Sequence, residues 1–218
     1  MTVSLATLLL ADGRLPTGGH VHSAGIESAV ADGRVHDVDT LADYVHGRLH
    51  TTGLTEAALA AAAVVHAREL AALDAEADAR IPVPALREAS RRLGRQLIRV
   101  AGRCWPDPVL ADLPEAPHQP VALGAVGIAA GIGAADVAAI AVHHAVTTPT
   151  QAAVRLLGLD PFAVAALAAG LAIAGAAVVT EAVAAAEGPI TELPARSGPA
   201  VEIAAAHHHL LDTRLFAS

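Results

Sequence analysis

Apolar and polar positions recur along most of the chain with the period of an α-helix. The clearest example is the stretch 84–104, where Leu86, Leu93, Leu97 and Val100 fall on one side and arginines on the other. Apolar residues three and four positions apart predict amphipathic helices that cover a common core. Helices are expected at residues 3–11, 22–32, 38–52, 55–78, 84–104, 120–131, 135–157, 161–187 and 199–209.

Composition strengthens this prediction. Of the 218 residues, 54% are hydrophobic, largely alanine, while aromatic residues are only 2%. Alanine is the best helix former, whereas aromatic and β-branched residues favour strands. We therefore predict an all-α bundle of about eight to ten helices.

A proline-rich connector, "WPDPVLADLPEAPHQP", spans residues 105–120 and divides a more charged first half from an apolar second half. It is either a linker between two domains or a segment around which one domain folds. The second half has too few polar positions to stand alone in water, so one domain over residues 1–218 is expected.

An alanine-rich core gains little from each buried side chain, because burial contributes roughly 25 cal/mol per Å² of apolar surface. Such helices must pack closely or share their surfaces with another chain. An oligomer or an obligate complex is therefore expected.

Charge and residue usage exclude several function classes. A formal charge of −8 argues against nucleic acid as a partner. All 14 basic residues are arginine, so the chain has neither the lysine of a P-loop nor that of a Schiff base. The single cysteine, Cys104, excludes an intrachain disulfide and a multi-cysteine zinc site. No basic segment precedes the first apolar run, so a cytoplasmic protein is expected.

A membrane span is the alternative for residues Phe162 to Val179, which run for 18 residues without a charge. The run is mostly alanine and glycine, with few of the larger apolar residues that favour insertion. A buried helix in the bundle is the favoured interpretation, and no membrane partner is expected.

The arginines of the stretch 84–104 fall four apart and form a ridge along one side of the predicted helix. This ridge is either a solvated face or a docking edge for an acidic protein surface. Its members are Arg87, Arg91, Arg95, Arg99 and Arg103.

The stretch "LPTGGHVHSAGIESAV", residues 15–30, combines paired glycines, two histidines and a glutamate. Gly18 and Gly19 could form an anion-binding nest, and His20 with His22 could chelate a metal. The third interpretation is a tight turn whose Thr17 or Ser23 caps the following helix. Local physical chemistry favours this turn, because a phosphate site lacks its lysine and the histidines are only two apart.

A second histidine cluster, His207, His208 and His209, lies near the C-terminus and is a weak candidate for nickel or zinc. Local spacing supports no Ser/His/Asp or Cys/His arrangement. We therefore expect no enzymatic activity and no firmly bound cofactor.

Two stretches resemble the signatures of the urease accessory protein UreF family. "LPTGGHVHSAGIESAV" is similar to its N-terminal signature, and "VEIAAAHHHLLDTRLFAS" to its C-terminal one. "SRRLGRQLIRVAG", "HQPVALGAVG" and "QAAVRLLGL" match weaker family patterns in the expected order. The chain departs from the family at His20, Ala24 and Asp212, where aromatic residues are usual, and these changes remove potential interface anchors.

The resemblance implies an all-helical, typically dimeric scaffold without catalytic activity. Such a protein binds UreD (also called UreH) and, through it, the GTPase UreG and the urease apoprotein. The complex regulates GTP-dependent nickel insertion into urease, and nickel is handled by the complex. A direct nickel-binding or storage protein that uses the histidine cluster is the alternative, followed by a small membrane protein.

By the same resemblance, segments at about residues 1–14 and 207–218 are flexible, and the tail becomes ordered on UreD through Arg214. His22, Ser23 and Glu27 are expected to form a local polar network. The residues expected to bind partners are Pro16, Thr17, Gly18, Gly19, His22, Ser23, Glu27, Arg155, Glu202, His208, Thr213, Arg214, Leu215 and Phe216.

Overall fold

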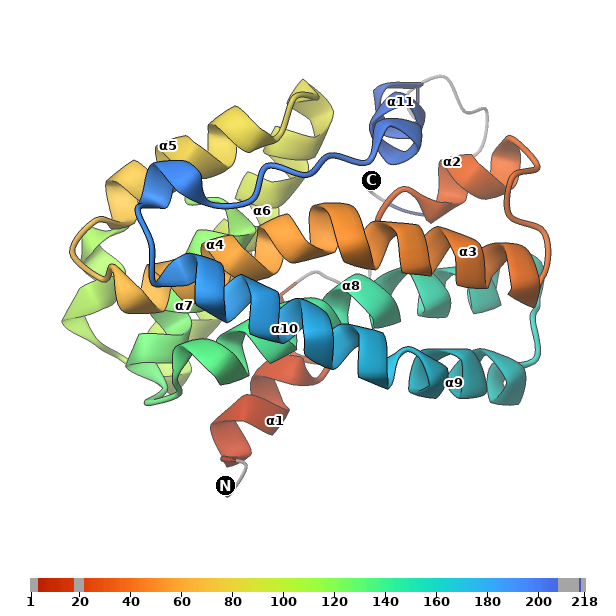
Figure 1. The fold of residues 1–218 in the computed structure, drawn as a ribbon. Helices are drawn as coiled ribbons and strands as arrows, with labels where there is room; N and C mark the ends of the chain where they lie inside the picture. Colours follow the sequence, from red (N-terminus) through yellow and green to blue (C-terminus); the bar gives the residue numbers. More distant parts are fainter. Residues whose placement is uncertain (1–3, 18–21, 208–215, 217–218) are drawn as a thin grey trace.

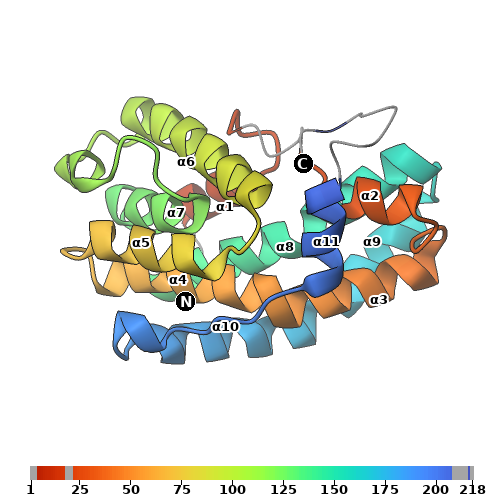
Figure 2. The same ribbon diagram turned by 90° about the horizontal axis from the view of Figure 1, so that it is seen from above.

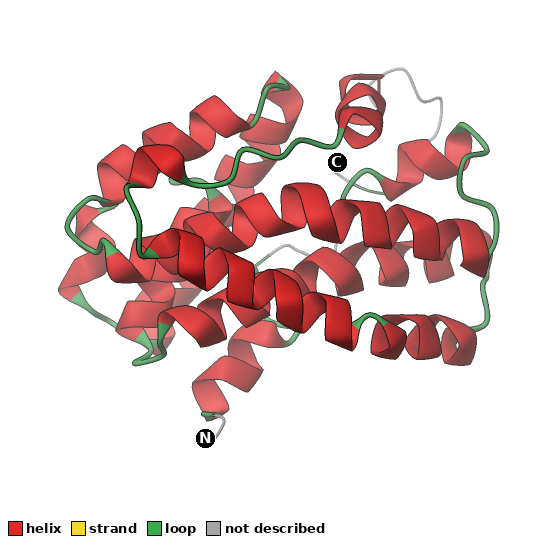
Figure 3. Ribbon diagram, in the orientation of Figure 1, coloured by secondary structure: helices red, strands yellow, loops and turns green. Residues whose placement is uncertain are grey.

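The computed structural model describes residues 4–17, 22–207 and 216, and within them it contains helices and no strand (Figure 3). The predicted all-α class is confirmed. The α-helices are α1 (Leu5–Ala11), α2 (Ile26–Ala31), α3 (Val38–Arg48), α4 (Leu54–Val65), α5 (Leu70–Arg80), α6 (Pro84–Cys104), α7 (Gln119–Ala129), α8 (Ala134–Leu157), α9 (Pro161–Gly170), α10 (Ala172–Ala186) and α11 (Pro199–His207). Single helical turns lie at Leu49–Gly53 (a π turn), Pro108–Asp112 and Ile190–Glu192 (both 3₁₀).

Helix α4 runs through the middle of the bundle, between α7, α8 and α10 (Figure 1). Its residues 57–63 are all buried, and six of these seven are alanine. Small side chains let neighbouring helices approach closely: a Cβ added to Gly124 of α7 would lie 2.4 Å from the Cβ of Ala63. The alanine-rich composition therefore builds its core by close backbone approach rather than by large side chains.

The helical segments from α3 to α5 are divided at a different residue from the predicted one. A break was expected near residue 53, but Gly53 keeps helical angles (φ −61°, ψ −44°) and a π turn joins α3 to α4. The helix stops instead at His66, whose Nε2 lies 2.9 Å from the carbonyl oxygen of Ala186 and 3.1 Å from that of Gly188. The prediction of one helix over 55–78 was wrong because these tertiary contacts end it.

The predicted helix 161–187 is also two helices, α9 and α10, which meet at Leu171 with a bend of 45°. Their outer side is exposed rather than buried, and Phe162 and Ile173 are 84% and 86% accessible. The expectation of a buried helix over Phe162–Val179 was therefore wrong. Among the described helices, none is by itself long and apolar enough to cross a membrane; α9 and α10 meet that test only together, across the bend.

The connector after α6 folds back onto the bundle instead of separating two bodies. It contains the 3₁₀ turn Pro108–Asp112, which packs on α7, and it ends at the fully buried His118. One cluster of buried apolar residues extends from Leu10 in α1 to Ala186 in α10. Residues 5–11, part of the N-terminal segment expected to be flexible, form α1 and pack on α8.

Candidate partner-binding site

The N-terminal motif enters α2 through two residues with left-handed backbone angles. Ala24 has φ +54° and Gly25 has φ +82°, and the Tyr44 hydroxyl donates a 2.7 Å hydrogen bond to the Ala24 carbonyl oxygen. A Cβ on Gly25 would lie 2.9 Å from both the Tyr44 hydroxyl and the Val201 side chain. The glycine of the motif is therefore required both by its backbone angle and by the approach of α11.

The predicted cap of this helix was wrong. Helix α2 begins at Ile26, after Gly25, and has no side-chain cap. The Thr17 hydroxyl bonds to the Leu15 carbonyl oxygen at 3.4 Å, and the buried Ser23 hydroxyl has no hydrogen-bond partner among the described residues. The left-handed turn at residues 24–25 moves Ser23 away from the capping position, one residue before the helix.

Glu27 connects the two ends of the sequence. Its carboxylate is buried and accepts a 3.3 Å hydrogen bond from the backbone N–H of Phe216. The guanidinium of Arg155, at the end of α8, lies 4.5 Å from the centroid of the Phe216 ring. Three residues expected to bind partners, from three distant parts of the sequence, thus meet at one place.

Helix α11 completes this region by packing on α2 and α6 (Figure 2). Glu202 accepts a 3.1 Å hydrogen bond from the N–H of Gly198 at the start of the helix. The segment before α11 is held by Thr55 of α4, whose hydroxyl lies 3.0 Å from the carbonyl oxygen and 3.1 Å from the N–H of Arg196. The N-terminal and C-terminal motifs therefore form one surface at the α2–α11 contact.

The other residues predicted to bind partners or metal lie elsewhere or outside the described residues. Of the N-terminal motif, Pro16 is exposed, and His22 is buried. His207 is the last residue of α11, and the described residues contain no group of three metal-binding side chains. The following predicted residues lie outside the described residues: Gly18, Gly19, His20, His208, His209, Thr213, Arg214 and Leu215.

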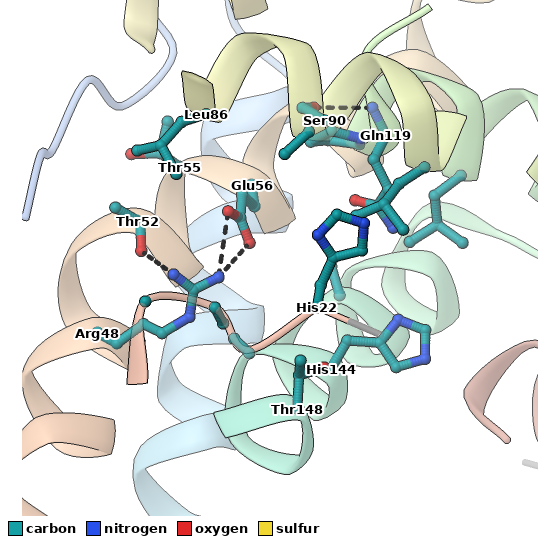
Figure 4. A pocket seen from close by; sticks show the side chains of 18 of the residues that line it. His22, Arg48, Thr52, Thr55, Glu56, Leu86, Ser90, Gln119, His144 and Thr148 are labelled. Atoms are coloured by element: carbon teal, nitrogen blue, oxygen red, sulfur yellow. Dashed lines mark hydrogen bonds and ion pairs between the residues drawn. The ribbon is translucent and has the colours of Figure 1, made fainter. Parts of the chain in front are cut away.

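A cavity of about 240 Å³ lies beneath the N-terminal motif, between α4, α6 and α8 (Figure 4). Arg48 enters it and donates to Thr52 at 3.1 Å and to both carboxylate oxygens of Glu56 at 3.3 Å. The Nε of Arg48 is buried and has no hydrogen-bond partner among the described residues. Because Glu56 balances the guanidinium charge, this cavity carries a paired charge rather than an open cationic site.

His144 of α8 also lines the cavity. Burial lowers its pKa to about 4, against an ordinary 6.5, and its ring is hydrogen-bonded to the backbone of Leu10 and Ala11. The ring is therefore neutral at neutral pH and holds α1 against α8.

The predicted arginine ridge is divided by the structure. Arg91 points toward α5, where it bonds to Asp74 at 3.0 Å and Asp78 at 2.7 Å, and Arg87 donates to the Ile81 carbonyl oxygen at 2.7 Å. These two residues hold α6 against its neighbours. Arg95, Arg99 and Arg103 are exposed and have no ion pair within the described part of the chain.

Sequence reasoning missed a polar cluster around His118. Its Nε2 lies 3.0 Å from Asp78, its Nδ1 lies 3.1 Å from the Ser90 hydroxyl, and its own N–H donates to Asp74 at 2.6 Å. Ser90 also accepts a 3.1 Å hydrogen bond from the N–H of Gln119, so its hydroxyl caps α7. Burial lowers the pKa of His118.

These contacts place a serine, a histidine and an aspartate in one row. The same atoms anchor the connector and the start of α7 to α5 and α6. The residues are 28 and 40 positions apart, which is why local spacing gave no signal. Two sequence features are consistent with this cluster: Asp74 and Asp78 are four positions apart, and His118 precedes the Gln-Pro pair that starts a helix.

Comparison with known proteins decides the family. The sequence model of the UreF family matches residues 35–172, which is more than half of the chain. The chain belongs to the UreF family.

Relatives of the same family cover the whole chain. A urease accessory protein UreF of Mycobacterium sp. (strain JLS) is 46% identical over 218 residues, covering all of both chains. That of Mycolicibacterium vanbaalenii is 45% identical over 99% of each chain. That of Mycobacterium tuberculosis (strain H37Ra) is 50% identical over 161 residues, 72% of this chain. The resemblance drawn from the terminal signatures is confirmed.

Proposed function

We propose that this UreF-family chain is a non-catalytic scaffold that links UreD, the GTPase UreG and the urease apoprotein, and regulates GTP-dependent nickel insertion into urease. Nickel is then the cargo of the assembly, and the chain needs no cofactor of its own. The absence of lysine supports this division of roles, because a P-loop requires that residue and the nucleotide chemistry then belongs to UreG.

The observation that supports a partner-binding role most directly is the meeting of the two terminal motifs. Glu27 and Arg155 both contact Phe216, although the three residues are far apart in sequence. A buried glutamate that accepts from the backbone near the C-terminus couples the order of that tail to the N-terminal motif. A partner that binds near Phe216 therefore also affects Glu27 and the start of α2.

Exposed apolar side chains support assembly with other chains. Leu5 and Leu8 of α1 are 71% and 58% accessible, and α9 and α10 expose Phe162 and Ile173. Exposed faces of this kind occur where another protein covers them. We propose that the chain acts as a homodimer in the cytoplasm and that part of this apolar surface is covered in the assembly.

Truncation after Ala206 tests the scaffold role. The truncated chain, co-expressed with UreD, UreG and the urease apoprotein, is expected to lose co-purification with UreD and to leave urease inactive. The matched control is the full-length chain with His207, His208 and His209 replaced by alanine, which is expected to keep both properties. A complex of normal yield with the truncated chain would contradict the proposal.

Equilibrium dialysis with nickel separates the scaffold from a nickel-storage protein. The wild-type chain is expected to bind nickel weakly, and the triple alanine variant is expected to support urease activation fully. Tight nickel binding that disappears in the triple variant together with urease activation would favour the storage function instead.

A further inference from the structure

The outer side of α6 carries a concentration of unpaired positive charge. Among the described arginines, those with no ion pair, hydrogen bond or ring contact are Arg68 and three residues of α6: Arg95, Arg99 and Arg103. Most other arginines have a carboxylate partner: Arg14 with Asp12, Arg34 with Asp32, Arg48 with Glu56, Arg80 with Glu76, Arg92 with Glu88 and Arg196 with Glu181. On a chain of net charge −8, three arginines of one helix thus have no partner among the described residues.

Contacts of the rest of α6 with its neighbours fix the orientation of the helix. Arg91 is held by Asp74 and Asp78, and Leu97 and Ala101 are buried. Gly94 allows the backbone of the connector to approach so closely that an added Cβ would lie 2.0 Å from the Pro117 carbonyl oxygen. These contacts keep Arg95, Arg99 and Arg103 on the outer side of the bundle.

Helix stability alone does not account for the three arginines. Like charges four positions apart destabilise an isolated helix by roughly 0.2–0.5 kcal/mol per pair. Arg103 lies in the last turn, where a cation favours the helix dipole, but Arg95 and Arg99 lie further inside. Within the described residues, no acidic side chain forms an ion pair with any of the three.

A shallow groove connects this surface to the N-terminal motif. It is lined by Gln96, Arg99, Val100, Arg103 and Cys104 of α6, and by Pro16 of the motif. The cationic side of α6 is therefore continuous with a segment whose sequence already indicates partner binding.

We propose that Arg95, Arg99 and Arg103 form a docking surface for an acidic segment of a protein partner in the urease maturation assembly. The proposal rests on the scaffold function and adds to it the surface and the partner chemistry. A guanidinium suits this role because it binds carboxylates in a bidentate geometry. Solvent-exposed charges of this kind mainly accelerate and orient association.

Two other polyanions fit the surface less well. Nucleic acid binding needs many phosphate contacts, and three arginines on a chain of net charge −8 supply too few. A membrane-surface helix needs exposed apolar residues beside its charges, whereas Leu97 and Ala101 of α6 are buried in the protein.

The test compares two single charge reversals at exposed, unpaired arginines, Arg99→Glu on the docking surface and Arg68→Glu outside α6. Each full-length variant is titrated at low and high salt against purified UreD, UreG and urease apoprotein, and against duplex DNA and anionic vesicles. Arg99→Glu is expected to weaken binding of one partner by about tenfold at low salt and to reduce the salt dependence, while Arg68→Glu changes neither. Arg99→Lys, which keeps the charge but loses the bidentate guanidinium, is expected to lose less affinity than Arg99→Glu.

Unchanged affinity of Arg99→Glu for all three partners would overturn the docking surface, as would an equal loss in Arg68→Glu. A fall only in binding to DNA or to anionic vesicles would overturn it in favour of another polyanion. Failure of the scaffold function is distinguishable, because the wild-type chain would then bind none of the three proteins. Thermal unfolding of both variants at the wild-type temperature shows that the fold is retained.

Discussion

At the scale of single residues, close packing decides what each position tolerates. Gly94 and Gly102 lie in the same helix, eight positions apart, and the sequence gives no reason to treat them differently. An added Cβ at Gly94 meets backbone of the connector at 2.0 Å, whereas at Gly102 nothing lies within 4 Å. The difference comes entirely from the segment packed against one of them.

Gly94→Ala is therefore expected to lower the free energy of unfolding by about 1–3 kcal/mol or more, since the obstructing atoms belong to the backbone. Gly102→Ala is the control and is expected to raise stability by up to about 1 kcal/mol through helix propensity. Urea unfolding of both variants measures the difference. Equal stabilities would show that the connector does not pack on α6 as described.

His144 predicts a pH dependence at the same scale. Burial depresses its pKa in the folded state to about 4, while the unfolded value is near 6.5. Between these values the unfolded chain binds more protons, so stability falls as the pH falls from about 6.5 to 4. The loss from this group is of the order of 3 kcal/mol.

His144→Gln, which keeps a hydrogen-bond donor but cannot titrate, is expected to flatten the stability curve in this pH range. His143→Gln is the comparison variant: His143 is adjacent and more exposed, burial lowers its pKa as well, and the variant is expected to change the curve less. Chemical unfolding at a series of pH values provides the measurement. Identical curves for the two variants would argue against a half-buried His144 that is neutral in the folded state.

At the scale of elements, polar contacts decide how helices begin, end and join. His66 ends α4 by bonding carbonyl oxygens at the end of α10, and Ser90 caps α7 from α6. Asp74 is almost completely buried and accepts from both Arg91 and the N–H of His118. Together with Asp78, which also contacts Arg91 and His118, it holds α5, α6 and the connector together.

Asp74→Ala is expected to lower the free energy of unfolding by about 3 kcal/mol, because it leaves a buried N–H without its acceptor and weakens the hold on Arg91. Cleavage by protease within the connector, residues 105–118, is expected to become faster. Asp112→Ala, an exposed aspartate of the same connector, is the control and should leave both quantities unchanged. Equal cleavage rates in the two variants would contradict the anchoring role.

At the scale of the whole molecule, the fold brings the two ends of the chain to one surface. Phe216 is buried next to α2 and α8 although almost the whole chain separates it from Glu27. Helix α11, which precedes Phe216 in the sequence, packs on α2. Phe216, close to the C-terminus, belongs to the same buried apolar cluster as α4.

Phe216→Ala is expected to increase amide hydrogen exchange in α11 and to weaken co-purification with UreD, while the melting temperature changes by only a few degrees. The reason is that the ring packs at the C-terminal end of the buried apolar cluster and makes the cation–π contact with Arg155, so its loss loosens the segment near α11 first. Phe162→Ala makes the same chemical change at a highly exposed position and is the matched control for α11 exchange. Unchanged exchange in Phe216→Ala would show that this ring does not hold the tail.

The sequence predicted the spans of the long helices correctly, but not the helix breaks or the partners of the arginines. The spans of α6 and α8 were predicted within one residue, because a long amphipathic repeat or a glycine at the helix end leaves a local signal. The breaks at His66 and Leu171 were missed, since local propensity there favours a continuing helix and remote contacts override it. The arginine ridge was read as one face, yet Arg91 turns inward because α5 supplies two carboxylates that spacing cannot reveal.

The sequence by itself determined the helical class, the small side chains of the core, the lack of a P-loop lysine and the terminal signatures of the UreF family. These are properties of composition and of short range along the chain. Only the tertiary structure decided that Glu27 and Arg155 meet at Phe216. It also decided that Arg91 has carboxylate partners, whereas Arg95 and Arg99 have none in the part of the chain that the structure describes. The physical reason is that periodicity fixes which residues share a helix face, whereas the partner across that face comes from packing of distant segments.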